Sequence, residues 1–247
     1  VISVTDAYLD TFSITLNDAV FVSGTEISAE GIYYLNVTAT DLADNTATEN
    51  IVFTIDKTAP EITITGVAND TVYNTDVTPY ITVMDTNLLS TIILLDGVSF
   101  TNGTTITTEG VHILYVNATD KAGNYAEVTI TFGIDKGAPV ITITGVEDGK
   151  YYNTNVTPII NITDDNLSYT IITLNGSPFV SGTTITDEGN YTLYVYAEDT
   201  AGNNASASVY FVIDKSKPTI IITNVTNGSY YNTNVTPVIS ITDTYLD

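Results

Sequence analysis

The stretch HILYVNATDKAGNYAEVTITFGID (112–135) decides the fold of this chain. On both sides of residues 121–124, apolar and polar side chains alternate, as they do along strands that bury one face. The segment between them contains Gly123, which favours a tight turn. The stretch therefore predicts a β-hairpin, and the residues of its first strand that face the core are expected to be Leu114, Val116 and Ala118.

Further short alternating segments precede this hairpin. They are interpreted as strands at 61–67, 78–85, 90–97, 98–101 and 104–107, with a loop between the first two. With the strands at 112–120 and 125–135, about seven short strands and no helical period predict an antiparallel β-sandwich.

The sandwich unit recurs every 79 residues without insertion or deletion, as Asp6, Asp85 and Asp164 show. Such self-similarity indicates an array of copies of one small fold. Because residues 1–10 resemble 238–247 and the sequence has no initiator Met or signal peptide, we expect it to be a piece of a longer protein. The period predicts a partial repeat without its first strand (1–57), two complete repeats (58–136 and 137–215), and a partial repeat holding only the first two strands (216–247). By the same spacing, the residues expected to face the core are Leu35, Val37 and Ala39 in the first repeat and Leu193, Val195 and Ala197 in the third.

The composition excludes several classes of protein. An apolar content of 43% is enough for packed cores, and the absence of Cys excludes disulfides and thiolate metal sites. Six basic residues against 29 acidic ones give a net charge of −23, which excludes nucleic acid as a partner and disfavours anionic lipid. No apolar run approaches the ~18 residues of a membrane span.

A Tyr follows an acidic residue and Gly at the start of the long strand in the first and third repeats, at Tyr33 and Tyr191. This placement predicts a tyrosine corner, in which the hydroxyl donates to upstream backbone. His112, the chain's single His, takes this position in the second repeat, and we expect its imidazole to make the same bond. The alternative is a ligand-binding or catalytic role, but no second His or Ser–Asp pair accompanies it.

The segments GVEDGKYYNTNVTP (145–158), LNGSPFVSGTTITDEGNYTLYVYAEDTAGN (174–203) and FVIDKSKP (211–218) resemble the bacterial Ig-like tandem repeats of microbial cell-surface and adhesin proteins. The D-x-A-G-N hairpin and the acid-Lys-x-x-Pro linker carry this resemblance. It implies an all-β chain of tandem immunoglobulin-like antiparallel β-sandwiches in an extracellular array. The first repeat has Asp44 where Gly is expected, and we expect the turn to survive because Asp tolerates left-handed backbone.

Short Pro-containing linkers predict that the repeats follow one another nearly in line, as a rod. At ~26 Å per strand, three units would span on the order of 100 Å.

Acidic residues recur at the ends of strands and in the linkers. Because strand direction alternates in a sandwich, the end of one repeat and the start of the next are expected to meet, which brings carboxylates from both together. Several oxygen ligands favour Ca²⁺. The alternative is that each Asp caps its own turn and faces water. The two candidate calcium sets are Glu30, Asp56, Asp85, Asn87 and Asp120, and Glu109, Asp135, Asp164, Asn166 and Asp199.

Asn-x-Ser/Thr sequons are dense in this chain. They fit either a glycosylated secreted protein or a composition rich in Asn and Thr. Two of them, at Asn155 and Asn234, precede Thr-Pro, which disfavours modification. The glycosylation candidates are Asn36, Asn69, Asn102, Asn117, Asn161, Asn166, Asn175, Asn190, Asn204, Asn224 and Asn227.

No repeated nucleophile–base set is visible, so we expect no enzyme activity. The leading interpretation is a structural region of a cell-surface protein, acting as an adhesin stalk or as the subunit of an extracellular filament or surface layer. Its partners would be copies of itself, neighbouring repeats or cell-surface glycans. The alternatives are a glycan-binding module and the accessory stalk of a secreted enzyme. The paired Tyr151 and Tyr152 would pack a junction between repeats or stack on sugar rings.

Overall fold

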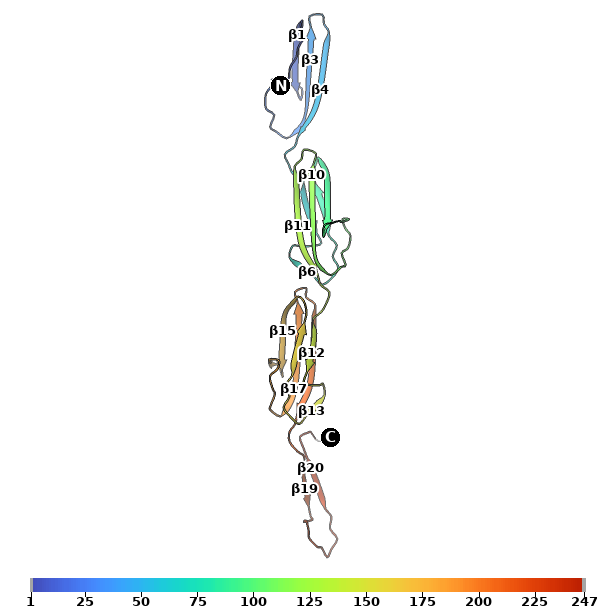
Figure 1. Cartoon of the computed structure of the whole chain (residues 1–247), viewed down its shortest axis with the longest axis vertical. Coiled ribbons are helices and arrows are strands. Elements are labelled where there is room, and N and C mark those ends of the chain that lie inside the picture. Colours follow the sequence, from blue (N-terminus) through green and yellow to red (C-terminus); the bar gives the residue numbers. More distant parts are fainter. Residues whose placement is uncertain (1, 246–247) are drawn as a thin grey trace. The chain divides into compact units, whose positions relative to one another are not determined.

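The computed structural model of the protein describes residues 2–245, and these form strands and no helix (Figure 1). The predicted all-β class is confirmed. Alternating side chains and frequent Gly and Asn turns account for this, since period-two patterns bury one face of a sheet and no segment has a helical period.

The third repeat is a sandwich of a two-stranded and a five-stranded sheet. In the small sheet, β12 (Val140–Thr144) pairs antiparallel with β14 (Ile159–Thr163). The large sheet has the order β13-β18-β17-β15-β16. Its strands are β13 (Lys150–Tyr152), β15 (Leu167–Leu174), β16 (Ser177–Pro178), β17 (Gly189–Asp199) and β18 (Asn204–Ile213).

The second repeat has the same two sheets. The small one pairs β5 (Glu61–Thr65) with β7 (Tyr80–Met84), and the large one has the order β6-β11-β10-β8-β9. Its strands are β6 (Thr71–Tyr73), β8 (Leu88–Leu95), β9 (Val98–Ser99), β10 (Gly110–Asp120) and β11 (Tyr125–Ile134).

The two partial repeats each contain one of these sheets. The first repeat has a four-stranded sheet, and residues 216–245 form a two-stranded one. Their strands are β1 (Leu9–Leu16), β2 (Ala19–Val20), β3 (Gly31–Asp41) and β4 (Thr46–Ile55), and β19 (Thr219–Thr223) and β20 (Val238–Thr242).

Three sequence-based expectations about strands were wrong. Residues 104–107 form no strand, because only Ile106 reaches a neighbour, through a single bridge to Val77. Residues 71–73, expected within a loop, form β6 at the edge of the large sheet. The pairing is also not antiparallel throughout. After β12 the chain crosses to the large sheet, where β13 pairs with β18 in parallel.

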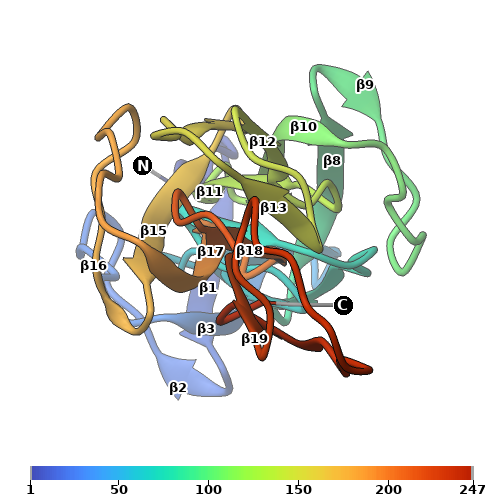
Figure 2. The ribbon, with the colours of Figure 1, turned by 90° about the horizontal axis from the view of Figure 1, so that it is seen from below.

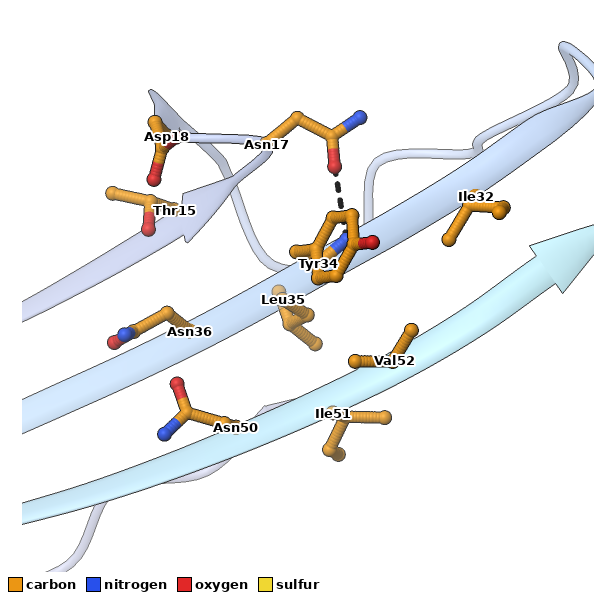
Figure 3. Close-up of a pocket in the computed structure, with 10 residues that line it drawn as sticks. All are labelled: Thr15, Asn17, Asp18, Ile32, Tyr34, Leu35, Asn36, Asn50, Ile51 and Val52. Carbon is orange, nitrogen blue, oxygen red and sulfur yellow. Dashed lines mark hydrogen bonds between the residues drawn. The ribbon is translucent and has the colours of Figure 1, made fainter.

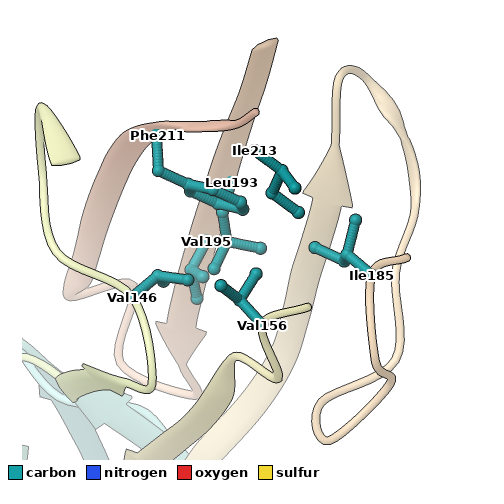
Figure 4. Packing of buried hydrophobic residues seen from close by; sticks show 7 residues of the cluster. All are labelled: Val146, Val156, Ile185, Leu193, Val195, Phe211 and Ile213. Atoms are coloured by element: carbon teal, nitrogen blue, oxygen red, sulfur yellow. The ribbon is translucent and has the colours of Figure 1, made fainter. Parts of the chain in front are cut away.

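The core lies between the two sheets, and Figure 4 shows it in the third repeat. Leu193, Val195 and Ala197 alternate along β17 and are 0% exposed, as are their equivalents Leu114, Val116 and Ala118 on β10. Isoleucines of β12 and β14 pack against the same cluster from the small sheet. The predicted inward face is thus confirmed in both complete repeats.

In the first repeat the equivalent side chains are less buried than this prediction implies. Leu35, Val37 and Ala39 on β3 are only half-buried. The reason is geometric, since no two-stranded sheet covers β3 among the described residues of this repeat.

The hairpin between β17 and β18 shows how the D-x-A-G-N motif turns the chain. The Asp199 carboxylate accepts from the backbone N–H of Asn203 at 2.8 Å, and Gly202 has φ +87°. In the first repeat Asp44 takes the Gly position with φ +63°, and Asp41 still accepts from the backbone N–H of Asn45. The expected survival of this turn is confirmed.

The tyrosine corners are also confirmed. The hydroxyl of Tyr33 donates to the carbonyl of Ala29 at 2.8 Å, and that of Tyr191 to the carbonyl of Asp187 at 2.9 Å. In the second repeat, Nε2 of His112 lies 2.9 Å from the carbonyl oxygen of Thr108, four residues upstream. The imidazole therefore replaces the phenol in a structural bond.

Candidate metal centres

Three carboxylates meet at the start of each complete repeat. At the third repeat these are Asp135, Asp164 and Asp199, which follow β11, follow β14 and end β17 respectively. One oxygen from each lies within 4.8 Å of the others. The second repeat gathers Asp56, Asp85 and Asp120 from the same places with the same spacing, so the sandwich topology builds the cluster twice.

Each carboxylate is held by its own turn. The hairpin residues Asp120 and Asp199 accept through both oxygens, from the backbone N–H and the side-chain amide of the Asn four residues on, whereas the other carboxylates accept from their turn through Oδ1. At the third repeat, Oδ1 of Asp135 accepts from the backbone N–H of Gly137 at 3.0 Å, and Oδ1 of Asp164 from that of Asn166 at 2.8 Å. At the second repeat, Oδ1 of Asp85 accepts from the backbone N–H of Asn87 at 2.7 Å. These are the turn caps expected as the alternative to clustering, and the chain has both.

Asn side chains connect the linker to the repeat that follows it. Nδ2 of Asn87 donates to Oδ2 of Asp56 at 2.6 Å, and Nδ2 of Asn166 to Oδ2 of Asp135 at 2.7 Å. The hairpin amides add a second contact, since Nδ2 of Asn203 donates to the carbonyl of Asp135 at 2.8 Å. Asn203 and its equivalent Asn124 were absent from the predicted sets, although their place in the D-x-A-G-N motif could have indicated them.

Burial distinguishes the members of a cluster. Asp120 and Asp199 are 0% and 2% exposed, whereas the linker residues Asp56 and Asp135 are half-buried. Burial raises the pKa of Asp120, but hydrogen bonds from the side chain and backbone of Asn124 outweigh it and hold that pKa below its usual range. This carboxylate therefore stays ionised close to two others, and like charges in such proximity repel each other.

Glu30, one of the two predicted Glu residues, bonds the linker that follows its repeat. Oε1 of Glu30 accepts from the backbone N–H of Lys57 at 2.7 Å and from the hydroxyl of Thr58 at 3.0 Å. Glu188 makes the same bond to the backbone N–H of Lys215 at 2.7 Å. Glu30 and its equivalent Glu109 are not members of the carboxylate clusters found among the described residues.

The predicted junction tyrosine contacts the final fragment. The ring of Tyr151 lies 5.8 Å from that of Tyr245 in an edge-on arrangement, and the Tyr245 hydroxyl donates to Oδ1 of Asn190 at 2.9 Å. Tyr152 instead packs its ring edge against Phe211 in the core. Tyr151 thus packs against the following segment, as the first of the two readings expected, whereas Tyr152 lies in the core of its own repeat.

A shallow cleft of about 620 Å³ lies on the sheet of the first repeat (Figure 3). Asn17, Asn36 and Asn50 contribute amides, and Tyr34 and Val52 contribute apolar surface. Asp18 is the one carboxylate among its lining residues, so this cleft brings together no acid–base pair.

His112 has a second partner besides the corner carbonyl. Its Nδ1 lies 2.8 Å from Oδ2 of Asp96, and Oδ1 of Asp96 accepts from the backbone N–H of Ile113. Burial lowers the pKa of His112, but the hydrogen bonds to Asp96 and Thr108 outweigh it and raise that pKa above its usual value. Both ring nitrogens face oxygen acceptors, which fits a protonated ring with a structural role.

The comparisons with known proteins agree with this fold. Residues 179–246 match the sequence model of the bacterial Ig-like domain (group 3), which confirms the predicted resemblance. The matched segment extends from the large sheet of the third repeat into the final fragment. No curated protein matches the sequence.

Three of the solved structures that match this chain have TM-scores below 0.5. Fibronectin(III)-like modules of Clostridium thermocellum CbhA are 18% identical over 62% of this chain and 94% of theirs, with a TM-score of 0.33. Immunoglobulin domains 1–4 of Sidekick-1 are 14% identical over 84% and 68%, with a TM-score of 0.40. Protocadherin gammaB7 EC3-6 is 15% identical over 97% and 78%, with a TM-score of 0.29.

Within residues 2–245, no helix is long and apolar enough to cross a membrane.

Proposed function

We propose that this chain is a structural repeat region of an extracellular surface protein, acting as an adhesin stalk or as a subunit of a filament or surface layer. The observation that carries the proposal is the doubled linker contact. In two successive repeats, Asn side chains from two loops hydrogen-bond the preceding linker, at Asp56 and at Asp135. A load-bearing array needs each link tied to the next in the same way, and it needs no catalytic set.

The extracellular location is supported by the match to a bacterial Ig-like domain and by a surface rich in Thr, Asn and Ser. Small-angle scattering of the whole chain tests the rod. A maximum dimension on the order of 100 Å for three units supports it, and a compact particle contradicts it. Enzyme assays with hydrolase and transferase substrates should give no turnover.

We also propose that Ca²⁺ binds at the two carboxylate clusters. Their donors are hard oxygen atoms, the kind that Ca²⁺ prefers, and each cluster holds three carboxylates whose mutual repulsion a divalent ion would offset. Asp135, Asp164 and Asp199 would provide one oxygen each at the third repeat. Rotation of the Asn166 amide would turn its own oxygen toward the ion.

Calorimetry with CaCl₂ tests this proposal. The whole chain should bind two ions, Asp199→Asn should remove one, and Asp120→Asn with Asp199→Asn should remove both. Asp18→Asn, which changes a carboxylate far from either cluster in sequence and outside both sets, is the matched control and should leave two sites. No heat of binding, together with a melting temperature unchanged by chelator, would reduce the clusters to turn caps.

N-glycosylation is proposed only for sequons whose amide is not needed by the fold. Asn102 is excluded because its Oδ1 accepts from the backbone N–H of Ile81 and its Nδ2 donates to the carbonyl of the same residue. Asn175 is excluded because it bonds Asn190 and Thr192 backbone atoms. Exposed sites such as Asn161 and Asn204 are the better acceptors. Mass spectrometry of the native protein tests this order, and glycan on Asn102 would contradict it.

A further inference from the structure

Four tyrosines form a strip on the outer face of the large sheet of the third repeat. Tyr169 lies on β15, Tyr194 and Tyr196 on β17, and Tyr210 on β18. These three strands are direct neighbours in the sheet, and Figure 2 views them from the end. The strip is defined by these four residues.

The strand register makes the strip diagonal. Tyr169 is opposite Glu198, and Tyr210 is opposite Thr192, at the two ends of a run that contains Tyr196 and Tyr194. Each step along β17 is two residues, so all these side chains share one face. Six residues of strand separate the two ends, which is about 20 Å along the strand axis.

Hydrogen bonds hold part of the strip in place. The hydroxyl of Tyr196 donates to Oε2 of Glu198 at 2.5 Å, and that of Tyr169 to the same oxygen at 3.3 Å. The two ring centroids are 5.7 Å apart. The bond to Glu198 raises the pKa of Tyr196, so this hydroxyl remains a donor. A surface whose rings are already ordered loses little side-chain entropy when it binds a ligand.

The strip is open to solvent. Tyr169 is 47% exposed, Tyr194 is 40% exposed and Tyr210 is 41% exposed, and Ile171 on the same face is 45% exposed. Contiguous apolar surface of this kind on a soluble domain marks a binding surface more often than isolated exposed residues do.

The other repeats show that the fold does not need these tyrosines. The inward Leu, Val and Ala of the long strand are the same in all three repeats, but the outward residues differ. At the position of Glu198, which bonds two of the tyrosines, the other repeats have Thr40 and Thr119. The second repeat, with a complete sandwich, keeps only one of the four aromatic rings. In the order Tyr169, Tyr194, Tyr196 and Tyr210, the equivalent residues are Thr11, Asn36, Thr38 and Val52 in the first repeat, and Ser90, Tyr115, Asn117 and Thr131 in the second.

We propose that the Tyr strip of the third repeat binds a neutral oligosaccharide chain. The C–H face of a sugar ring stacks on an aromatic face, and Glu198 with the tyrosine hydroxyls would bond the sugar hydroxyls at its rim. Because the strip is flat and runs diagonally across three strands, an extended ligand fits it better than a compact ligand does. No Lys lies on β15, β17 or β18, and the chain carries a net charge of −23, so an anionic glycan would be repelled.

This binding surface is independent of the structural role proposed above. It belongs to one repeat, whereas the linker contacts recur in two, so either can fail without the other. It would add a specific adhesive contact to an otherwise repetitive region.

The test uses an array of neutral gluco-, manno-, galacto- and N-acetylglucosamine oligosaccharides with the whole 247-residue chain. The variant Tyr169→Ser, Tyr196→Asn and Tyr210→Thr installs the residues that the second repeat already has at these positions. It should fold normally and bind at least about tenfold more weakly, the change that a loss of about 1.4 kcal/mol gives. The matched control Tyr115→Ala, on the outer face of the second repeat, should bind as the unmodified chain does.

Three outcomes would overturn the proposal. The first is that no neutral oligosaccharide on the array binds, and the second is that binding is the same in the triple variant. The third is that sedimentation shows a dimer of the unmodified chain that the triple variant loses, which would assign the strip to a second copy. If the triple variant unfolds the third repeat, Tyr210→Thr alone decides, because Tyr210 makes no bond to Glu198 and its loss should still weaken binding.

Discussion

The third and first repeats contain the same long strand with different degrees of burial. On β17, Leu193, Val195 and Ala197 are 0% exposed, whereas Leu35, Val37 and Ala39 on β3 are half-buried. The alternation of apolar residues is identical, so the pattern alone does not close a core. Burial needs the two-stranded sheet, whose isoleucines on β12 and β14 pack against the β17 cluster.

The largest expected effect comes from truncating the same core position in these two repeats. Leu193→Ala should destabilise the third repeat by about 2–5 kcal/mol, because it empties a fully enclosed site. Leu35→Ala should cost less, because that side chain is only half-buried and water already reaches it. Hydrogen exchange, followed separately for the amides of β17 and of β3, measures the loss of stability that each substitution causes. Equal losses of protection would show that the small sheet is not what closes the core.

A second comparison uses the hairpin Asp. Asp120 and Asp41 cap the same turn with the same bonds to Asn124 and Asn45, but Asp120 is 0% exposed and Asp41 is half-buried. Asp120→Ala should cost about 1–3 kcal/mol, since it leaves enclosed backbone donors unpaired. Asp41→Ala should cost less, because water replaces the carboxylate. Thermal unfolding in the absence of Ca²⁺ measures this difference, and a larger loss for Asp41→Ala would contradict it.

The smallest effect distinguishes the corner of the second repeat from that of the third. His112 has a raised pKa, so its contribution to stability is complete below its unfolded value of about 6.5 and is lost as the pH rises through the folded value. Asp96 has a lowered pKa because hydrogen bonds from His112 and Ile113 outweigh burial, so its contribution is lost only as the pH falls through that lower value. The Tyr191 corner of the third repeat should not respond between pH 6 and 9.

Hydrogen exchange of β10 and β17 against pH measures this contrast. Protection of β10 should fall between pH 6 and 9 as His112 loses its proton, whereas that of β17 should not change with this titration. His112→Tyr combined with Asp96→Asn restores the residues found at both other corners and should remove the pH dependence. A second repeat insensitive to pH in the unmodified chain would show that folding does not raise the pKa of His112.

Much of this protein could be predicted from local pattern. Period-two alternation determines which residues of a long strand face inward, and the Glu-Gly-x-Tyr and D-x-A-G-N motifs determine a corner and a turn through bonds within a few residues. The carboxylate clusters were also predictable, because alternating strand direction places Asp135, Asp164 and Asp199 at one end of a sandwich. Their Asn partners Asn124 and Asn203 were not among the predicted ligands, since the hairpin motif already accounts for those residues locally.

Other features depend on contacts between segments far apart in the chain. Residues 71–73 become β6 only because the edge of the large sheet offers backbone groups to pair with, and 104–107 lack such a partner beyond the bridge at Ile106. The half-burial of Leu35 and the diagonal order of the Tyr strip likewise follow from which sheet lies opposite and from the register between strands. The sequence alone thus determined the faces of the strands, because alternation is local. Only the tertiary structure decided what covers each face, because packing and register join residues that no local pattern connects.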